Sequence, residues 1–420
     1  MKQIVGITAI FLGMQGFWAQ QNVRLDSCIS WTKRNYPLLK QNGLLEQMSD
    51  VNIRAINENW LPKISLAGQA VYNTEVIKLS LPGVPAIPHD TYLTSLGIEQ
   101  LIFDGGQTRQ QKSIDRVSTD LDNQRNEVEL YKLVDRVNQI YVGVLLAQEN
   151  LKMLDLFKSN LENRRKNMQA AVNNGLVLAS SLDELDVEVL KTDQSRYESH
   201  ENLISLLKTL SILTHQELNE FMAFDVEPIG GMMPVKESIA RPELKMLSLQ
   251  EQLVDERYKL TTKMALPRIF VSMAGNYGRP GPNFINQDLR FFGNVTLGFK
   301  WNMSSLYGLR REREKMELNK EMVDVQRETF LLSLETSLVG QRAQINTLQT
   351  LIDKDKTIID KRSSIVSVAA SQLDNGKITV TNYLLQLNEE MAAKLNKKIH
   401  EIKLMNAISN YNTTIGLTNF

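Results

Sequence analysis

The side chains that most often carry out chemistry are scattered along this 420-residue chain. The four histidines, His89, His200, His215 and His400, lie far apart and lack the short spacings that hold a metal ion. The single cysteine, Cys28, has no histidine near it in the sequence, and no serine stands in a Gly-x-Ser-x-Gly nucleophile motif. We therefore predict that the protein is not an enzyme and has no catalytic residue, no metal site and no cofactor.

The charged residues indicate a solvated surface rather than a nucleic-acid interface. Lysine and arginine together number 48, aspartate and glutamate also number 48, and the formal net charge is zero. Phosphate backbones bind proteins that carry a basic surplus, which this chain lacks. The neighbouring carboxylates Glu389 and Glu390 stand among many other charges in a predicted helix, where solvent exposure is the simpler interpretation.

Residues 1–19 have the pattern of a secretory signal peptide. Lys2 supplies the positive charge, Ile4–Phe17 is apolar, and a cleavage region follows at Trp18-Ala19-Gln20. The alternative interpretation is a short buried helix. A membrane anchor needs ~20 apolar residues, so this run is too short, and no other stretch approaches that length. Cys28 has a poor context for lipid attachment, and we predict a packed thiol in the first helix.

Two segments that run from a strand into a helix organise the rest of the chain. Leu96–Arg109 and Leu297–Arg310 both open with Leu-Gly and close with Arg, 201 residues apart. Other landmarks recur in the same order at nearly the same spacing, such as Leu-Pro-Lys-Ile at 61–64 and Leu-Pro-Arg-Ile at 266–269. This ordered set predicts an internal duplication. The predicted parts are a first repeat at 20–227, a linker at 228–236 and a second repeat at 237–420.

Each repeat is predicted to follow one plan. A helix ends at Leu-Pro, two strands follow with a Pro- and Gly-rich loop between them, and a long helix turns at Asn-Gly into a returning helix. The predicted strands are 64–72, 93–103, 269–277 and 294–303, and the predicted long and returning helices are 107–173, 178–219, 308–374 and 378–414. A 67-residue helix would be roughly 100 Å long.

The long helices carry apolar residues at alternating spacings of four and three, which predicts a coiled-coil seam. The seam of the second long helix runs from Leu334 to Ala369 and includes the polar residues Gln341, Asp355 and Arg362. Polar residues weaken a dry core, so we expect them where a helix wall meets water.

The predicted strands alternate between apolar and polar residues. In the last strand one face is apolar, and the other consists of Asn294, Thr296, Gly298, Lys300 and Asn302. A soluble sheet sandwich would give a similar alternation. The length of about ten residues also suits a strand that spans a membrane.

Four amphipathic strands cannot span a bilayer alone, because the two sheet edges would expose unpaired N–H and C=O groups to lipid. Chains must therefore associate to close the sheet. Two chains give eight strands, a barrel filled by its own side chains, whereas three chains give twelve and leave room for a lumen. The residues predicted to line that lumen are Glu99, Asn294, Thr296, Lys300 and Asn302.

In several sequence motifs, the chain resembles the TolC-like outer-membrane efflux protein family. The resemblance covers nearly all of the chain after residue 19 and rests on Trp60–Ile64, Gln100–Gly106, Arg241–Leu244 and the two Asn-Gly turns. It implies a homotrimer with a twelve-stranded barrel in the outer membrane of a Gram-negative bacterium, embedded in outer-membrane lipid and continued by a helical tunnel in the periplasm. It also implies two partners, a periplasmic adaptor and an inner-membrane transporter of the RND or ABC type.

The resemblance also assigns roles to two groups of residues. The helix turns at Asn174, Gly175, Asn375 and Gly376 would contact the adaptor. In the family, acidic residues narrow the periplasmic end of the tunnel six and nine positions after the turn glycine. This chain has Asn382 and Leu385 at those positions, and Ser181 and Glu184 in the first half, so it lacks the paired carboxylates of the second half. A constriction built from these four residues and Tyr383 is one interpretation, and ordinary helix-surface residues are the other.

We therefore predict a passive outer-membrane exit duct of a tripartite efflux or type I secretion system. A soluble periplasmic or surface-exposed coiled-coil scaffold, with its strands in a small sandwich, is the alternative. Drugs, metals, peptides and proteins leave through members of the family, so the resemblance does not identify the cargo.

Overall fold

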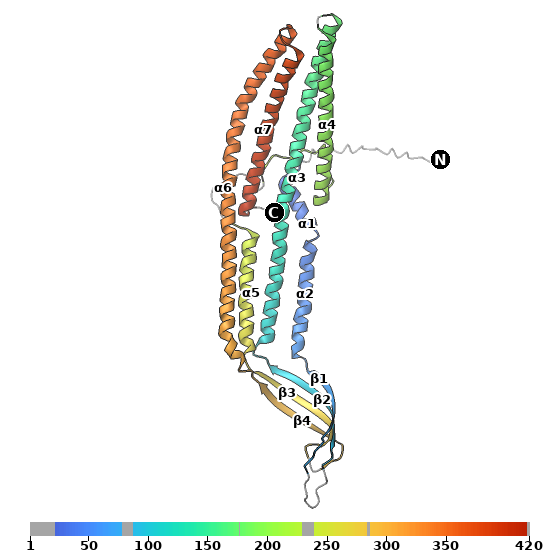
Figure 1. Ribbon diagram of the computed structural model, residues 1–420, viewed down its shortest axis with the longest axis vertical. Coiled ribbons are helices and arrows are strands. Elements are labelled where there is room, and N and C mark those ends of the chain that lie inside the picture. The colour runs from blue at the N-terminus through green and yellow to red at the C-terminus, as the bar shows by residue number, and fades with distance from the viewer. Residues whose placement is uncertain (1–21, 78–86, 176, 229–238, 284–285, 418–420) are drawn as a thin grey trace, which may run out of the picture. The chain divides into compact units, whose positions relative to one another are not determined.

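The computed structural model describes residues 22–77, 87–175, 177–228, 239–283 and 286–417. The predicted signal peptide and most of the predicted linker lie outside these residues. The first helices and strands are α1 (Leu25–Asn35), α2 (Leu39–Asn57), β1 (Lys63–Tyr72), β2 (Asp90–Phe103), α3 (Gln107–Asn173) and α4 (Ala179–Thr214). They are followed by α5 (Pro242–Met264), β3 (Arg268–Arg279), β4 (Arg290–Lys300), α6 (Ser305–Asp374) and α7 (Val380–Ile415) (Figure 1). The order helix, two strands, long helix, returning helix therefore occurs twice.

The chain forms two compact units. The sheet unit consists of Pro37–Glu129 and Pro242–Ser333, and contains α2, α5, the four strands and the first parts of α3 and α6. The hairpin unit consists of Met1–Tyr36, Leu130–Arg241 and Leu334–Phe420, and contains α1, α4, α7 and the rest of the long helices.

The predicted elements are present, but several of their ends differ. β2 begins at Asp90, three residues earlier than predicted, because Asp90 still pairs with Tyr72 of β1. β4 ends at Lys300 rather than at residue 303, because its partner there is Arg268, the first residue of β3. α4 ends at Thr214 rather than at residue 219, because His215 adopts a left-handed backbone with φ of 55°.

The four strands form one antiparallel sheet in the order β1-β2-β3-β4. The register is continuous along β1–β2 and β3–β4, and shifts once in β2, between Leu101 and Phe103. This shift places Phe103 opposite Ile269 and so turns its side chain to the same face as Ile269. β1 and β4 are the two edges of the sheet.

Two glycines and an aspartate join β2 to α3. Gly105 and Gly106 have φ of 68° and 81°, a left-handed backbone that favours glycine. A Cβ added at Gly105 would also lie 2.8 Å from Leu266 Cβ, so the turn leaves no space for a side chain. The Asp104 carboxylate accepts the N–H groups of Gly106 and Thr108, both at 2.7 Å, and so caps α3 as its sequence position predicts.

The start of α6 is built differently from the start of α3. By the internal repeat, Ser304 or Ser305 occupies the place of Asp104, and the sequence therefore predicts that one of them accepts backbone N–H groups at the start of α6. The structure corrects this expectation, because both hydroxyls donate to Asn302 instead, at 2.5 Å to its side-chain oxygen and 2.6 Å to its carbonyl. A hydroxyl that donates to an acceptor two or three residues earlier in the chain tightens the turn before the helix.

The predicted seams form the core of the hairpin unit. Along α3 the buried seam residues are Leu130, Val134, Val137, Tyr141 and Val144, and along α6 they include Leu334, Leu338, Ile345, Leu348 and Ala369. Cys28 is fully buried in the same cluster as the α3 seam, as predicted, and burial raises the pKa of its thiol to about 12.

The polar seam residues of α6 are paired within the chain, whereas the sequence suggested that they face water. The Gln341 side chain donates to the Thr414 hydroxyl at 2.9 Å, and Asp355 lies 2.6 Å from the His400 ring. Arg362 donates to the carboxylate of Glu389 at 3.0 Å. All three contacts join α6 to α7, so these polar residues set the register of the two helices in addition to packing them.

We expect Gly105→Ala to destabilise the sheet unit by about 1–3 kcal/mol, because alanine disfavours the left-handed backbone and its Cβ would overlap Leu266. Gly43→Ala in α2 is the matched control. A Cβ at Gly43 meets no atom within 4 Å, so this change should stabilise the helix by about 0.5–1 kcal/mol. Urea unfolding followed by circular dichroism measures both. Equal effects of the two changes would contradict this account of the turn.

Candidate functional site

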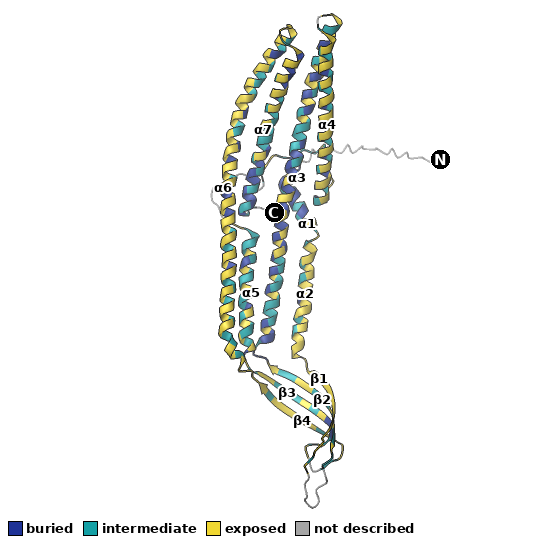
Figure 2. Cartoon of the chain, in the orientation of Figure 1, coloured by how far each residue is buried: buried dark blue, intermediate teal, exposed yellow. Residues whose placement is uncertain are grey.

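One face of the sheet is apolar and largely exposed in the single chain. Figure 2 shows that most of the strand residues are exposed. The register aligns Ile64, Leu66, Leu96, Ile98, Met273, Val295, Leu297 and Phe299 on this face. Aromatic residues gather on it at the end far from the helices, and there the rings of Tyr277 and Phe291 lie 4.5 Å apart. A face of this kind needs either a partner or an apolar solvent, because such patches are rare on soluble monomers.

The opposite face of the sheet carries the polar side chains. Lys63, Glu99, Ser272 and Thr296 form one row across the four strands. Asn294 lies on the same face and accepts a hydrogen bond from Asn276 at 3.3 Å. Four of the five predicted lumen residues therefore share this face. Asn302 lies beyond the end of β4, in the turn before α6.

Phe270 is an apolar residue on this polar face that the sequence pattern did not single out. Its ring lies over Gly298 of β4, where an added Cβ would be 2.5 Å from the ring. Gly298 therefore leaves the space into which Phe270 packs.

A hollow of about 400 Å³ lies in the sheet unit where the polar face meets the start of α3. Lys63, Glu99, Arg268 and Lys300 line it from the four strands. Asp104 lines it from the turn before α3. Burial acts to raise the pKa of Asp104, but the hydrogen bonds from Thr108 and from backbone N–H groups outweigh it and hold the pKa below its ordinary value.

Lys63 and Arg268 were missed as site residues by the sequence reasoning, which used them only as landmarks. The signal that could have found them is their matching position. Each is the cation that follows Leu-Pro and opens the first strand of its repeat, at 61–64 and 266–269. The register then places both on the polar face.

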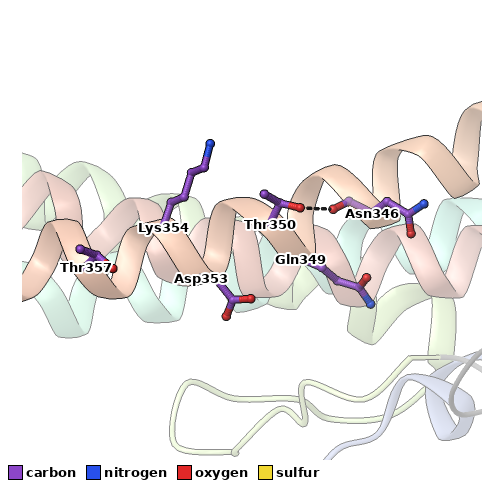
Figure 3. A pocket seen from close by; sticks show the side chains of 6 residues that line it. All are labelled: Asn346, Gln349, Thr350, Asp353, Lys354 and Thr357. Atoms are coloured by element: carbon purple, nitrogen blue, oxygen red, sulfur yellow. Dashed lines mark hydrogen bonds between the residues drawn. The ribbon is translucent and has the colours of Figure 1, made fainter.

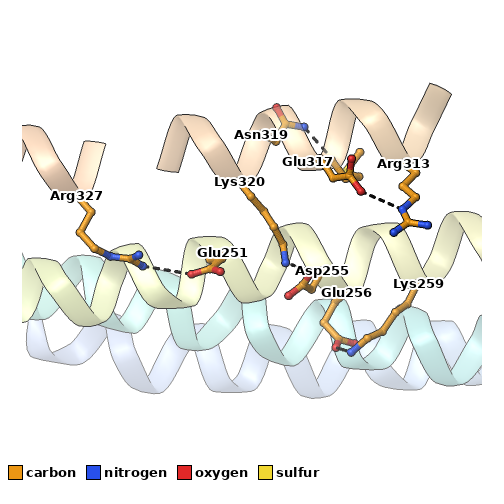
Figure 4. Close-up of polar contacts among 10 residues, drawn as sticks. Glu251, Asp255, Glu256, Lys259, Arg313, Glu317, Asn319, Lys320 and Arg327 are labelled. Atoms are coloured by element: carbon orange, nitrogen blue, oxygen red, sulfur yellow. Dashed lines mark hydrogen bonds and ion pairs between the residues drawn. The ribbon is translucent and has the colours of Figure 1, made fainter. Parts of the chain in front are cut away.

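Ion pairs tie α5 to α6 in the sheet unit (Figure 4). Lys320 lies 2.6 Å from Asp255, and Arg327 lies 3.2 Å from Glu251. These pairs are partly exposed, so each contributes about 0–1 kcal/mol. Their main effect is to hold α5 and α6 side by side, and they add little to the free energy of unfolding.

Glu256 of α5 is buried and joins α5 to α3. It accepts a hydrogen bond from the Gln110 side chain at 2.5 Å and another from Lys259 at 2.6 Å. The hydrogen bonds from Lys259 and Ser113, the first being the larger effect, outweigh burial and lower the pKa of Glu256 to about 2. The carboxylate is therefore ionised in the folded protein at neutral pH.

The hairpin unit ends in two helix turns. Gly175 and Gly376 have φ of 69° and 65°, and a Cβ at either would meet no atom within 4 Å. Asn375 donates to the Ser371 carbonyl at 2.8 Å, and Asn174 and Gly376 also close their turns through backbone hydrogen bonds. Backbone hydrogen bonds therefore close both turns, and the space beside each glycine is open.

The five residues predicted to form a constriction lie just beyond these turns, on α4 and α7. Glu184 accepts the Thr381 hydroxyl at 2.9 Å, which joins the two helices. Asn382 and Leu385 are exposed, and Ser181 is partly exposed. Tyr383 is buried, with the Arg164 guanidinium 4.7 Å from the centre of its ring.

A second hollow lies along α6 in the hairpin unit. Its side chains, Asn346, Gln349, Thr350, Asp353, Lys354 and Thr357, are polar and come from this one helix (Figure 3). Thr350 donates to the Asn346 carbonyl at 3.0 Å. A hollow on a single helix face has no opposing wall that could enclose a ligand, so we assign it no site.

Within the described residues, no group of three or more histidine, cysteine, aspartate or glutamate side chains is arranged to hold a metal ion. The helices of the described chain include none that is both long and apolar enough to cross a membrane.

Solved structures of outer-membrane channels share this fold. The Campylobacter jejuni CmeC outer membrane channel is 15% identical, with 94% of this chain and 86% of that chain covered and a TM-score of 0.62. The open-state MtrE outer membrane channel of Neisseria gonorrhoeae is 11% identical, with 94% and 89% covered and a TM-score of 0.64. The outer membrane protein VceC of Vibrio cholerae is 11% identical, with 93% and 94% covered and a TM-score of 0.62.

No protein-family model matches the sequence, and no curated protein matches it. The similarity to other proteins is therefore seen in the structure and not in a sequence match. It confirms, at the level of the fold, the resemblance to TolC-like proteins that the sequence motifs predict. The chain has the fold of these outer-membrane channels along nearly its whole length.

We expect the Glu256 carboxylate to stabilise the fold in a pH-dependent way. Its folded pKa of about 2 lies below its ordinary value of 4.5, so its contribution is complete above about pH 5 and is lost as the pH falls towards 2. Glu256→Gln should lower the free energy of unfolding by about 1–2 kcal/mol at pH 7, and the difference from the unaltered protein should shrink below pH 4.5.

Urea unfolding of the detergent-solubilised protein at fixed concentration, repeated between pH 7 and pH 3, measures this difference. Glu317→Gln is the matched control, because Glu317 pairs with Arg313 on the exposed surface of α6 and its loss should cost no more than about 0.5 kcal/mol at any pH. A Glu256 effect that stays constant with pH would contradict the assignment.

Proposed function

We propose that this protein is a passive exit channel in the outer membrane of a Gram-negative bacterium, assembled as a homotrimer and without enzymatic activity. The observation that carries the proposal is the sheet itself. Its two edges are open, one face is apolar and exposed, and the other face is polar. The outer-membrane channels that share the fold support the same conclusion.

The apolar face would contact lipid. Its strands are 10 to 14 residues long, so each is long enough for the 9–11 residues that a tilted strand needs to cross a bilayer. The aromatic residues at its far end, Tyr72, Tyr92, Tyr277 and Phe291, would lie at the level of the lipid headgroups, as aromatic girdles do in other barrels.

The open edges would close by pairing β4 of one copy with β1 of the next. This pairing satisfies the backbone groups that lipid cannot satisfy. Three copies give twelve strands and a water-filled lumen, which fits a polar inner face that includes Glu99, Asn294, Thr296 and Lys300. Two copies would leave the charged residues Glu99 and Lys300 in a barrel without room for water.

Two apolar stripes on the helices of the sheet unit offer a second contact between copies. Leu44, Met48 and Val51 form a stripe on α2, and Leu318, Met322 and Val325 form one on α6. All six side chains are more than half exposed in the single chain. A stripe on α2 that packs against the stripe on α6 of the next copy makes a head-to-tail contact, and such contacts form a ring when the rotation between copies closes.

The hairpin unit would extend the duct into the periplasm. The turns at Asn174, Gly175, Asn375 and Gly376 are open at their front, which suits contact with a periplasmic adaptor. The adaptor would connect the duct to an inner-membrane transporter of the RND or ABC type, which supplies the energy. Asn382, Leu385, Ser181 and Glu184, on a scaffold that includes Tyr383, are our candidates for a constriction of the tunnel.

Conductance in planar lipid bilayers tests the channel most simply. The full-length protein without its predicted signal peptide should give discrete conductance steps, and its mass in the same detergent should be that of three chains. A monomer or dimer that stays in solution without detergent and gives no steps would contradict the proposal, and would favour the coiled-coil scaffold instead.

Substituting the two faces of β4 tests which face meets lipid. Leu297→Lys should destabilise the membrane-inserted protein by about 2–4 kcal/mol, because it places a charge on the apolar face. Thr296→Lys, one residue earlier on the polar face, should change stability by less than about 1 kcal/mol. The fraction of folded trimer after urea titration in lipid vesicles measures both. Equal tolerance of the two lysines would contradict the membrane orientation.

A further inference from the structure

Two cations face each other directly across β3 and β4 on the polar face of the sheet. Arg268 opens β3, Lys300 ends β4, and the register pairs them. Side chains at directly opposed positions have Cβ atoms about 5 Å apart, and like charges there destabilise a sheet. The Arg268 guanidinium donates to the Gln107 side-chain oxygen at 2.6 Å, a neutral partner. The repulsion between Arg268 and Lys300 lowers the stability of the sheet, which points to a functional reason for keeping both charges.

A third cation adjoins this pair. Lys63 opens β1 and lines the same hollow of about 400 Å³ as Arg268 and Lys300. Two acids, Glu99 and Asp104, also line the hollow, and the Asp104 carboxylate is held at the turn that begins α3 by two backbone N–H groups. The three cations outnumber the two acids, so the hollow has a net positive charge.

We propose that Lys63, Arg268 and Lys300 form a cationic collar that binds small anions and anionic groups of solutes, such as phosphates and carboxylates, and makes the channel prefer anions. This inference rests on the channel function proposed above. An anion between Arg268 and Lys300 would screen their repulsion, and the hollow is large enough to hold one with part of its hydration shell. Rings of lysine and arginine select anions in other pores.

The assembly would turn the collar into a ring. Because every neighbouring pair of strands is antiparallel, β4 ends at the same end of the sheet at which β1 begins. When β4 of one copy pairs with β1 of the next, Lys300 comes close to Lys63 of the neighbouring copy. The collar would then surround the lumen at the level where the strands meet the helices, with no gap at the boundary between copies.

The reversal potential of the reconstituted channel tests the inference. Under an about tenfold KCl gradient centred near 0.1 M, where screening lengths are ~10 Å, chloride should be more permeant than potassium. Lys63→Gln and Lys300→Gln should each lower the chloride-to-potassium permeability ratio at least about twofold. Glu99→Gln should raise it, whereas Lys300→Arg should leave it unchanged because the charge is kept. Inorganic phosphate should reduce the chloride conductance of the unaltered channel more than that of Lys300→Gln.

The outcomes separate the two proposals. A protein that yields no conductance steps overturns the channel function. Discrete steps from a trimer with a preference for potassium, or with a permeability ratio that none of the charge-removing changes moves, overturn the cationic collar and leave the channel intact. The trimer mass of each variant, measured in detergent, shows that a changed ratio does not come from misfolding.

Discussion

The backbone hydrogen bonds at the two edges of the four-stranded sheet are the constraint on which this structure depends. β1 and β4 each present one row of N–H and C=O groups that the sheet of a single chain does not pair. Water could satisfy those groups, but water would also meet the apolar face that contains Leu66, Leu297 and Phe299. Lipid suits that face and cannot satisfy the edges, where each unpaired group costs several kcal/mol. The closure with other copies that we propose would satisfy both demands.

The junction between strands and helices lets the wall that the sheet forms continue into the helices. Gly105 allows β2 to turn sharply into α3, and Asp104 caps the helix at the same point. β4 likewise leads into α6 after a short turn around Asn302. Long helices that start where the strands end extend one wall with two kinds of secondary structure. The charged residues of the polar face gather at this junction, which is why we place the selectivity of the proposed channel there.

Much of this fold follows from sequence patterns that have a direct physical cause. Alternation in β4 assigns Leu297 and Thr296 to opposite faces, and the spacing of Leu334, Leu338 and Ile345 identifies the buried seam of α6. The local sequence pattern predicts less well where the position of a paired strand or helix decides the structure. The end of β4 depends on where β3 begins, and the pairing of Asp355 with His400 depends on a helix 45 residues away. The direct opposition of Arg268 and Lys300 was likewise invisible until the register was known.

Cysteine cross-linking between the two sheet edges tests the closed sheet most directly. Cys28 is the only native cysteine and is buried, so introduced thiols report on their own positions. A cysteine at Gln69 of β1 would be combined in turn with one at Asn294, Thr296 or another polar-face position of β4, and oxidised in the membrane. The account predicts that at least one combination yields covalent dimers and trimers and no larger species. Monomers at every combination, or a ladder that continues beyond three chains, would contradict it.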